Sequence, residues 1–277
     1  MFVAPWYPAG PIRFISEAFE KLGHQVWRVG PLYNQHGSVD WGNDRVHADL
    51  VIPNQLKHWD LPKYLDECTR AIGAPDFAFL SEENYQTEIT PLPSAIPSAL
   101  WSIDGHPENY ERHAVWGATI NYSANCLGTA ANPRTEIHPA WRWLPTGWAP
   151  WAHPRINFRQ ERRVWHFSLH ASQYGKRKEI CDGLEKQGLK VRSGFVPTQQ
   201  YVEGANFSLF TYHNCQKNGG EVKFRFYENA GMGCVNISDK SQLMEDLGYR
   251  PWVHFVPFPE EFLDGELWPD VACLAAL

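Results

Sequence analysis

The sequence lacks the patterns that identify disulfide scaffolds, zinc fingers and membrane spans. Its 277 residues include only six cysteines, which are scattered along the chain with no close pair. This spacing argues against a zinc finger or a disulfide framework, and it favours reduced thiols in a cytoplasm. No apolar run reaches the roughly 18 residues that a membrane span needs, so no span is predicted. The N-terminus has neither a basic segment nor a long apolar one, so no signal peptide is expected.

The chain also lacks three motifs that mark metal or nucleotide chemistry: Asp-x-Asp, Cys-x-x-Cys and the phosphate loop Gly-x-x-x-x-Gly-Lys-Ser/Thr. The first two are common in sites that hold a divalent metal, and the third marks the commonest class of kinases and ATPases. We therefore expect no metal site and no cofactor, and a kinase or phosphatase is a weaker alternative.

Charged residues are few and unevenly distributed. They make up 20% of the chain, and the formal net charge is −6. Residues 1–150 contain 10 Lys+Arg against 16 Asp+Glu, a net of −6, whereas residues 155–225 contain 13 against 6, a net of +7. A basic segment in an acidic protein indicates either a local anionic ligand or an ordinary solvated surface.

Short apolar segments alternate with helical ones in the first half of the chain. Residues 2–4 predict a strand, residues 12–22 a helix that Gly23 ends, and residues 24–29 a second strand. This strand–helix–strand unit is typical of the start of a parallel α/β sheet. Further strands are predicted at residues 50–52, 77–80, 100–103, 119–122 and 142–144.

A second α/β pattern follows residues 145–154, which are rich in proline and tryptophan and are interpreted as a linker. Strands are predicted at residues 164–169, 189–192, 207–210 and 253–256, and helices at residues 176–187, 199–203 and 241–247.

Residues 218–237 are the most informative stretch. They predict a glycine loop, a short helix ended by glycine, and a buried strand. The N-terminus of a helix attracts phosphate, because its N–H groups are unpaired and its dipole is positive there. Arg225 and Glu228 are three residues apart and share one face of this helix. That face offers a cation to a phosphate and an acceptor to a sugar hydroxyl, which suits a nucleotide-sugar. The alternative is a surface salt bridge between the two side chains.

Three segments, in this order and spacing, resemble the GT-B glycosyltransferases. Residues 223–235 are similar to the signature of the donor-binding helix. Leu-Pro-Thr-Gly at residues 144–147 resembles the motif that leads into the second domain, and residues 168–177 resemble the strand–loop–helix that opens it. Together they suggest the CgeB-like branch, which is associated with bacterial spores and phages.

The resemblance implies an α/β fold with two Rossmann-like domains that face a cleft. Residues 1–145 would form the acceptor-side domain and residues 146–257 the nucleotide-sugar-binding domain. The tail at residues 258–277 would pack back on the first domain.

The resemblance also implies roles for the polar residues near the donor helix. Glu228 would accept hydrogen bonds from the ribose hydroxyls. Lys223 and Arg225 would hold the diphosphate, on which negative charge builds as the donor bond breaks. Lys176 and Arg177 open another helix and would clamp the same diphosphate.

The nucleobase would lie, by analogy, against the loop at residues 197–201, with Phe195 or Tyr201 packing on it. Either aromatic residue is alternatively part of the core. GT-B enzymes neutralise the diphosphate with side chains and helix dipoles instead of a divalent ion, so the lack of metal motifs agrees with the resemblance.

An inverting reaction needs a base for the acceptor hydroxyl, and Asp104 and His106 are the catalytic candidates. Both follow a strand of the first domain, and Gly105 between them allows a tight turn that aims both side chains at the acceptor. Alternatively, Asp104 caps the turn. Glu82 and Glu83 are further candidates, and a retaining reaction needs no such base.

The sequence therefore predicts a metal-independent glycosyltransferase of the hexosyltransferase type. It would move a sugar from a nucleotide-diphosphate sugar, with UDP favoured, to an acceptor hydroxyl in the cytoplasm of a bacterial or phage-infected cell. A hydroxymethylated base in phage DNA is one candidate acceptor, which the basic segment permits, although the net charge of −6 argues against a large DNA footprint. The alternative is a non-catalytic nucleotide-sugar-binding or structural protein on the same scaffold.

Overall fold

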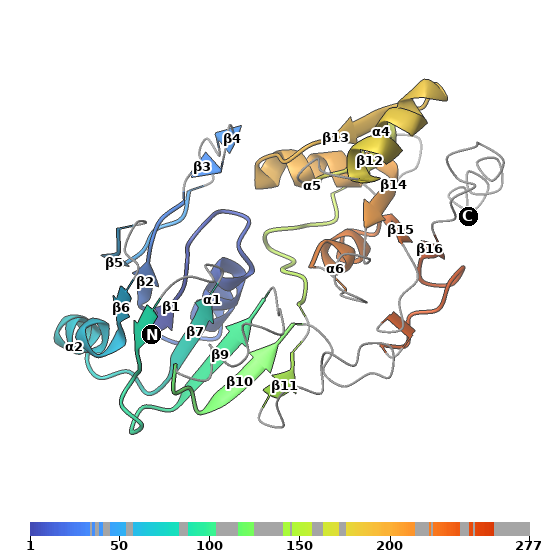
Figure 1. Cartoon of the computed structure of the whole chain (residues 1–277). Helices are drawn as coiled ribbons and strands as arrows, with labels where there is room; N and C mark the ends of the chain where they lie inside the picture. Colours follow the sequence, from blue (N-terminus) through green and yellow to red (C-terminus); the bar gives the residue numbers. More distant parts are fainter. Residues whose placement is uncertain are drawn as a thin grey trace. The chain divides into compact units, whose positions relative to one another are not determined.

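The chain divides into two compact units, Met1–Pro145 and Thr146–Leu277, and Figure 1 shows the elements of each in a computed structural model. The structure describes residues 1–33, 35–36, 39–40, 45–53, 58–82, 88–103, 116–124, 141–144, 146–156, 163–171, 176–213, 222, 224–238, 244–245 and 247–257.

The first unit is built on a parallel sheet of seven strands in the order β11-β10-β9-β7-β1-β2-β5. Its elements are β1 (Phe2–Val3), α1 (Pro11–Lys21), β2 (Arg28–Gly30), β3 (Gln35–His36), β4 (Val39–Asp40), β5 (Leu50–Val51), β6 (His58–Asp60), α2 (Leu61–Ile72), β7 (Ala78–Glu82), β8 (Glu88–Thr90), β9 (Ser98–Ser102), β10 (Ile120–Ser123) and β11 (Trp141–Trp143). The strands β6 and β8 form a separate parallel pair, and β3 and β4 an antiparallel one.

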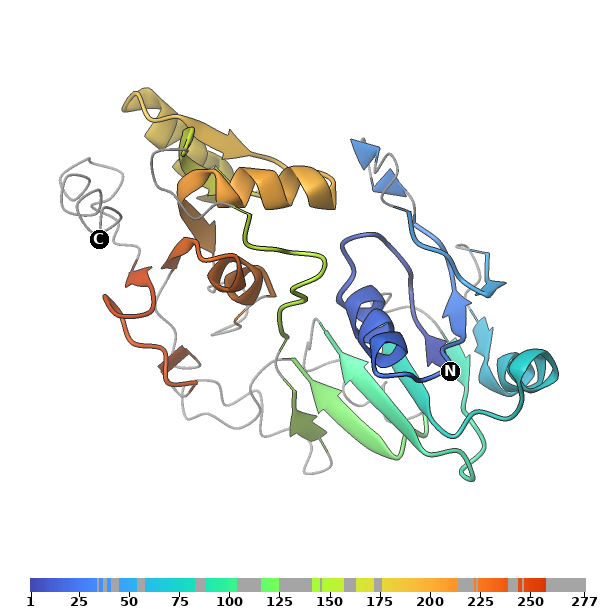
Figure 2. The same ribbon diagram turned by 180° about the vertical axis from the view of Figure 1, so that it is seen from behind.

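Both faces of this sheet are buried, so its strands read as short apolar runs. Successive residues of β1 alternate between two core clusters, with Val3 in one and Phe2 in the other. The helix α1 adds Ile12 to the cluster of Phe2, whereas α2 adds Leu61 to the cluster of Val3. Figure 2 shows α1 lying along one face of the sheet. The chain adds β2 and β5 on one side of β1 and later strands on the other, so the strand order reverses beside β1.

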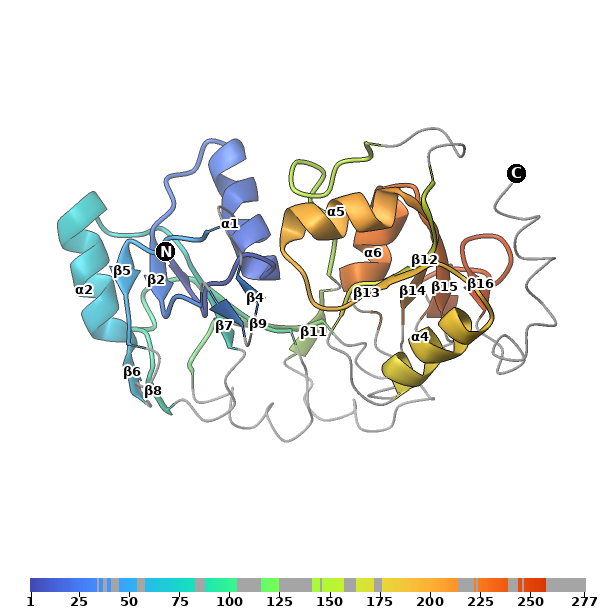
Figure 3. The ribbon, with the colours of Figure 1, turned by 90° about the horizontal axis from the view of Figure 1, so that it is seen from above.

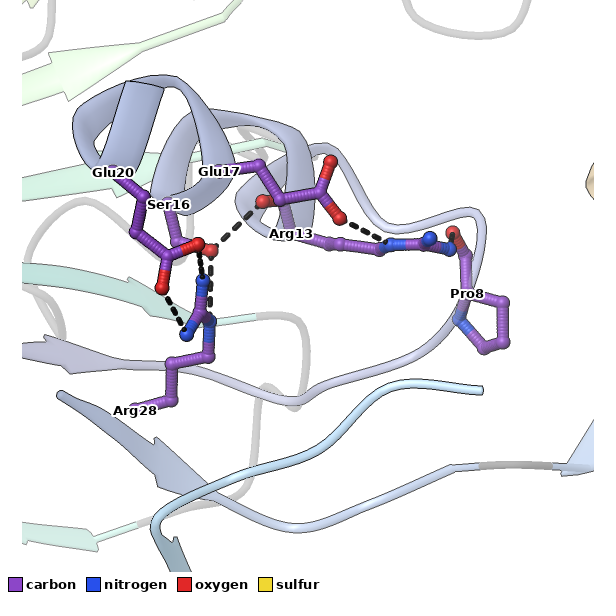
Figure 4. A network of polar contacts seen from close by, with 6 residues as sticks. All are labelled: Pro8, Arg13, Ser16, Glu17, Glu20 and Arg28. Atoms are coloured by element: carbon purple, nitrogen blue, oxygen red, sulfur yellow. Dashed lines mark hydrogen bonds and ion pairs between the residues drawn. The ribbon is translucent and has the colours of Figure 1, made fainter. Parts of the chain in front are cut away.

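Two arginines fix α1 in the first unit: the buried Arg28 joins it to β2, and Arg13 joins it to the loop that follows β1. The Arg28 guanidinium pairs with Glu20 at 2.7 Å and donates from Nε to the Ser16 hydroxyl at 3.1 Å. Arg13 donates to the carbonyl of Pro8 in the loop at 2.7 Å and pairs with Glu17 at 2.8 Å (Figure 4). The hydrogen bond from Arg28 lowers the pKa of Glu20, so this carboxylate stays charged at neutral pH.

The second unit contains a parallel sheet of five strands in the order β13-β12-β14-β15-β16. Its elements are β12 (Trp165–Leu169), α4 (Lys176–Lys186), β13 (Val191–Ser193), α5 (Thr198–Asn206), β14 (Ser208–His213), α6 (Phe224–Gly231), β15 (Val235–Ser238) and β16 (Val256–Pro257). Figure 3 shows α4 on one face of the sheet and α5 and α6 on the other. Because the chain moves from β12 first to β13 and then back to β14, the sheet has a topological switch point between β12 and β14.

Two predicted strands are shorter than expected. Residues 24–27 are irregular, and β2 begins only at Arg28. Residues 253–255 are not a strand either, because the chain turns there: Trp252 has a φ of 64°, and the N–H of His254 bonds the carbonyl of Arg250 at 2.9 Å. The predicted helix at residues 199–203 extends to Asn206. Most of the predicted helix at 241–247 and the whole tail at 258–277 lie outside the described residues.

Candidate functional site

Polar side chains meet at the carboxyl edge of the second sheet, where open α/β sheets bind ligands beside the switch point. His170 follows the last residue of β12, and Arg192 is the second residue of β13. Tyr201 lies in the first turn of α5, and Arg225 and Glu228 lie on α6. Gly204 on α5 makes room for this group, because a Cβ there would lie 2.2 Å from Nε2 of His170 and 3.2 Å from Cδ of Arg192.

Arg225 and Glu228 form a buried ion pair. Nη1 of Arg225 donates to Oε2 of Glu228 at 2.7 Å, and the two side chains are only 15% and 3% exposed. Their spacing of three residues on α6 brings them together, as the sequence predicts. The salt bridge of the alternative interpretation is therefore present, but it is largely buried and not at the surface. A buried ion pair offsets the cost of desolvation only when its geometry is close and further groups hydrogen-bond to it.

The Tyr201 ring packs against the Arg225 side chain. The Arg225 guanidinium stands over the Tyr201 ring, 3.9 Å from its centroid. Burial, followed by the charge of Glu228, raises the pKa of Tyr201 well above its usual value, so the phenol stays neutral and donates to Oδ1 of Asn229 at 2.8 Å. Burial by itself lowers the pKa of Arg225, but Glu228 and Tyr201 outweigh it and raise that pKa, so the guanidinium stays charged.

A histidine from outside the helices contacts the second oxygen of the carboxylate. Nε2 of His153 lies 3.5 Å from Oε1 of Glu228, and the histidine side chain is 1% exposed. Its ring also meets the Tyr201 ring edge-on, with centroids 5.7 Å apart. Glu228 is therefore held by Arg225 on one oxygen and faces His153 on the other.

His170 is a neutral imidazole beside two cations. It is 6% exposed, and its ring meets Tyr201 edge-on with centroids 5.6 Å apart. Burial, followed by the charges of Arg225 and Arg192, lowers the pKa of His170 to about 3, and a backbone hydrogen bond with Gly194 opposes this shift. The cluster thus contains two arginines, one carboxylate and an uncharged imidazole, so its positive charges outnumber its negative ones by one.

We expect acid to destabilise the second unit through His170. Its pKa is lower in the folded protein than the 6.5 of a free histidine, so the unfolded chain binds more protons below pH 6.5 and stability falls as the pH falls. Between pH 6.5 and pH 5 this one group costs about 2 kcal/mol. Denaturant unfolding of wild type and His170→Gln at both pH values measures the difference. His47→Gln, at an exposed histidine of the first unit, is the control, and equal acid losses in all three proteins would contradict the assignment.

The structure brings together three of the residues that the sequence singled out: Tyr201, Arg225 and Glu228. The Tyr201 ring is 2% exposed and Arg225 covers one face, which agrees with the core position given above as its alternative. Its nucleobase role stays a prediction. Phe195 is partly buried in the segment between β13 and α5, and its nucleobase role stays a prediction.

The other predicted residues are not placed in this cluster. Arg177 is partly buried in the first turn of α4, and Lys176 begins that helix with a side chain outside the described residues. Lys223, Asp104 and His106 also lie outside the described residues.

Three residues of the cluster were missed by sequence reasoning: His153, His170 and Arg192. For His170 and Arg192 a signal was available, because both lie at the carboxyl end of a predicted strand, where ligands bind in such sheets. For His153 there was none, since the proline-rich stretch around it was interpreted as a linker.

The described residues contain neither a metal cluster nor a membrane-spanning helix. Among the described residues, no three His, Cys, Asp or Glu side chains are grouped closely enough to hold a metal ion. Within the same residues, no helix has the length and apolarity to cross a membrane.

Comparison with known proteins identifies the fold. No family model and no curated protein matches the sequence. Three solved structures of an alpha-glucosyltransferase are similar at 12% identity. One is in complex with UDP and a 13-mer DNA with a central A:G mismatch (TM-score 0.65, covering 99% of this chain and 90% of that chain). The others hold UDP-glucose and DNA with an abasic site (0.61, 99% and 90%), and UDP and a 13-mer DNA with an HMU base (0.59, 100% and 91%). At this identity the likeness shows the fold alone, and it confirms that the chain has the α/β GT-B fold.

Proposed function

We propose that this chain is a glycosyltransferase that binds a UDP-sugar in its second unit and transfers the sugar to an acceptor hydroxyl. The observation that carries the proposal is the buried Arg225–Glu228 pair at the carboxyl edge of the second sheet. An ion pair at this depth is costly to build for stability alone, whereas it provides both a cation and an acceptor where nucleotides bind in α/β sheets.

The donor diphosphate lies against the arginines in this proposal. Arg225 uses part of its guanidinium for Glu228 and Tyr201. Because arginine carries five donors, further N–H groups remain for phosphate oxygens. Arg192 approaches from β13, and the N-terminus of α6 adds its dipole. Lys176, Arg177 and Lys223 are the further diphosphate ligands that the sequence proposes. Fixed cations lower the barrier because charge grows on the leaving diphosphate as the sugar departs.

Glu228 is proposed to accept hydrogen bonds from the ribose hydroxyls. Its two carboxylate oxygens have about four acceptor positions, of which Arg225 takes one and His153 faces another. A carboxylate held this firmly loses little further freedom when the ribose binds. The protein cations do the work of a metal in this scheme, so we propose that donor binding needs no divalent ion.

UDP is expected to raise the melting temperature of the protein without added Mg²⁺. At a concentration 100 times the Kd, binding stabilises the folded protein by about 2.7 kcal/mol, and Glu228→Ala should abolish this shift. Thermal unfolding with and without UDP and EDTA measures it. Glu185→Ala, at an exposed glutamate of α4, should keep the full shift. Equal shifts in both variants, each relative to its own ligand-free protein, would remove the donor-site assignment.

The acceptor is proposed to be a hydroxyl on a modified DNA base. The basic residues 155–225 support this, as do the DNA-bound structures of the same fold, one of which holds an HMU base. The base that activates the hydroxyl is proposed to be Asp104 or His106. Membership of the CgeB-like branch stays a prediction.

The transfer itself is testable by mass spectrometry. We expect UDP-glucose and a duplex with one hydroxymethylated base to give an oligonucleotide one hexose heavier, while the unmodified duplex stays unchanged. Of Asp104→Ala and His106→Ala, the variant that removes the base should abolish transfer while keeping the UDP-induced shift. Donor binding with neither transfer nor donor hydrolysis would favour the alternative, a non-catalytic nucleotide-sugar-binding protein.

A further inference from the structure

The segment Thr146–Ile156 has a tertiary structure of its own, although its composition reads as a linker. It is the first described part of the second unit. The backbone N–H of His153 bonds the carbonyl of Ala149 at 2.9 Å, and Nε1 of Trp148 donates to the carbonyl of His153 at 2.9 Å. These bonds close the segment into a compact turn that buries the His153 side chain.

This segment is anchored to the donor half of the unit. Asn206, at the end of α5, donates to the carbonyl of Pro154 at 3.1 Å and accepts from the N–H of Ile156 at 2.9 Å. At the end of α6, a Cβ on Gly231 would lie 2.2 Å from the Trp148 ring, so glycine lets the indole touch the helix backbone. The segment is therefore fixed at both α5 and α6.

His153 extends from the segment to the carboxylate of Glu228. Its Nε2 lies 3.5 Å from Oε1, on the oxygen opposite the one that Arg225 holds. In the described part of the chain, Glu228 from α6 and Tyr201 from α5 face this imidazole. With Arg225 alone, the carboxylate is free to turn about its last bond, whereas contacts on both oxygens leave it one orientation.

We propose that His153 is a positioning residue of the donor site, which fixes the Glu228 carboxylate in the orientation that receives the ribose hydroxyls. The inference rests on the proposed function, because that function assigns Glu228 to bind the ribose hydroxyls. It means that the segment leading out of the first unit takes part in nucleotide recognition. Partners that orient metal ligands contribute about 10-fold or more to metal affinity, and we expect an effect of the same size here.

The test compares two nearly isosteric variants, His153→Gln and His153→Met. Glutamine keeps an N–H donor within reach of Glu228 and methionine does not, while both disturb the packing on Tyr201 alike. Dissociation constants for UDP and for pyrophosphate are measured by competition against a fluorescent UDP, beside the ligand-free melting temperatures. His47→Met, at an exposed histidine of the first unit, is the control.

We expect His153→Met to bind UDP about 10-fold more weakly and pyrophosphate as well as wild type does, because pyrophosphate has no ribose. His153→Gln should recover most of the UDP affinity. If the Met and Gln variants bind UDP equally, or if UDP and pyrophosphate weaken together, the positioning role is overturned while the donor site stands. If the wild-type protein binds neither ligand, the proposed function itself has failed.

Discussion

Gly30→Ala is expected to lower the melting temperature of the first unit by about 10 °C. Gly30 has a φ of +148°, and a Cβ there would lie 1.8 Å from the carbonyl oxygen of Ala4. That oxygen belongs to the backbone just after β1, so it cannot turn away as a side chain would. Strain at such a φ costs about 1–3 kcal/mol, and overpacking adds about as much again. For a unit of this size each kcal/mol lowers the melting temperature by about 3 °C.

The position also explains why the effect should spread beyond one residue. Next to Gly30, the indole of Trp6 donates to the carbonyl of Val29 at 2.9 Å, and the N–H of Trp6 bonds the carbonyl of Pro31 at 2.8 Å. The loop after β1 and the end of β2 therefore hold each other at the point where the strand order reverses. Moving Gly30 away from Ala4 breaks these bonds.

Gly73→Ala separates strain from crowding. Gly73 ends α2 in the same unit with a φ of +96°, but nothing lies within 4 Å of the added Cβ. Its ψ of 167° places it in a region that essentially only glycine adopts, so Gly73→Ala should cost only the conformational strain, about 1–3 kcal/mol. Thermal unfolding, with amide exchange of β1 and β2 peptides to locate the change, measures both variants. Equal effects from the two substitutions would show that the contact with Ala4 is not what requires glycine.

Arg225→Met is expected to lower the free energy of unfolding of the second unit by about 3 kcal/mol or more. The Glu228 side chain is only 3% exposed, and the substitution removes the cation paired with it. A buried charge without its partner destabilises the folded state. Arg225→Met/Glu228→Gln should recover much of the loss, because no uncompensated charge remains. Denaturant unfolding of the wild type, both single variants and the double variant gives the coupling energy.

The matched pair on the other unit is Arg13 and Glu17, which are bonded at 2.8 Å but 22% and 25% exposed. Glu17→Gln should change stability by less than about 1 kcal/mol, because ion pairs that keep contact with water contribute little. The coupling energy between Arg225 and Glu228 could instead prove as small as that of an exposed pair. Such a result would show that burial does not make Glu228 depend on Arg225. In that case Glu228 would tolerate loss of Arg225, and the proposed donor site would lose its main physical argument.

The sequence by itself determined the fold class and much of the element order. Apolar periodicity is local, so strands such as β12 and helices such as α4 are readable within a few residues of their true ends. The spacing of Arg225 and Glu228 is equally local, because three residues along a helix bring two side chains to one face. Where local signals failed, as at residues 253–255, a turn with positive φ at Trp252 replaced the expected strand.

Only the tertiary structure decided the surroundings of that pair. Burial distinguishes a site from a surface salt bridge, and it depends on how α5, α6 and the segment Thr146–Ile156 pack together. The contact of His153 with Glu228 and the cover of Arg225 over Tyr201 join residues far apart in the chain. No period of 2 or 3.6 residues carries such information. The sequence thus determined which residues share a helical face, and the packing decided that this face is enclosed and charged.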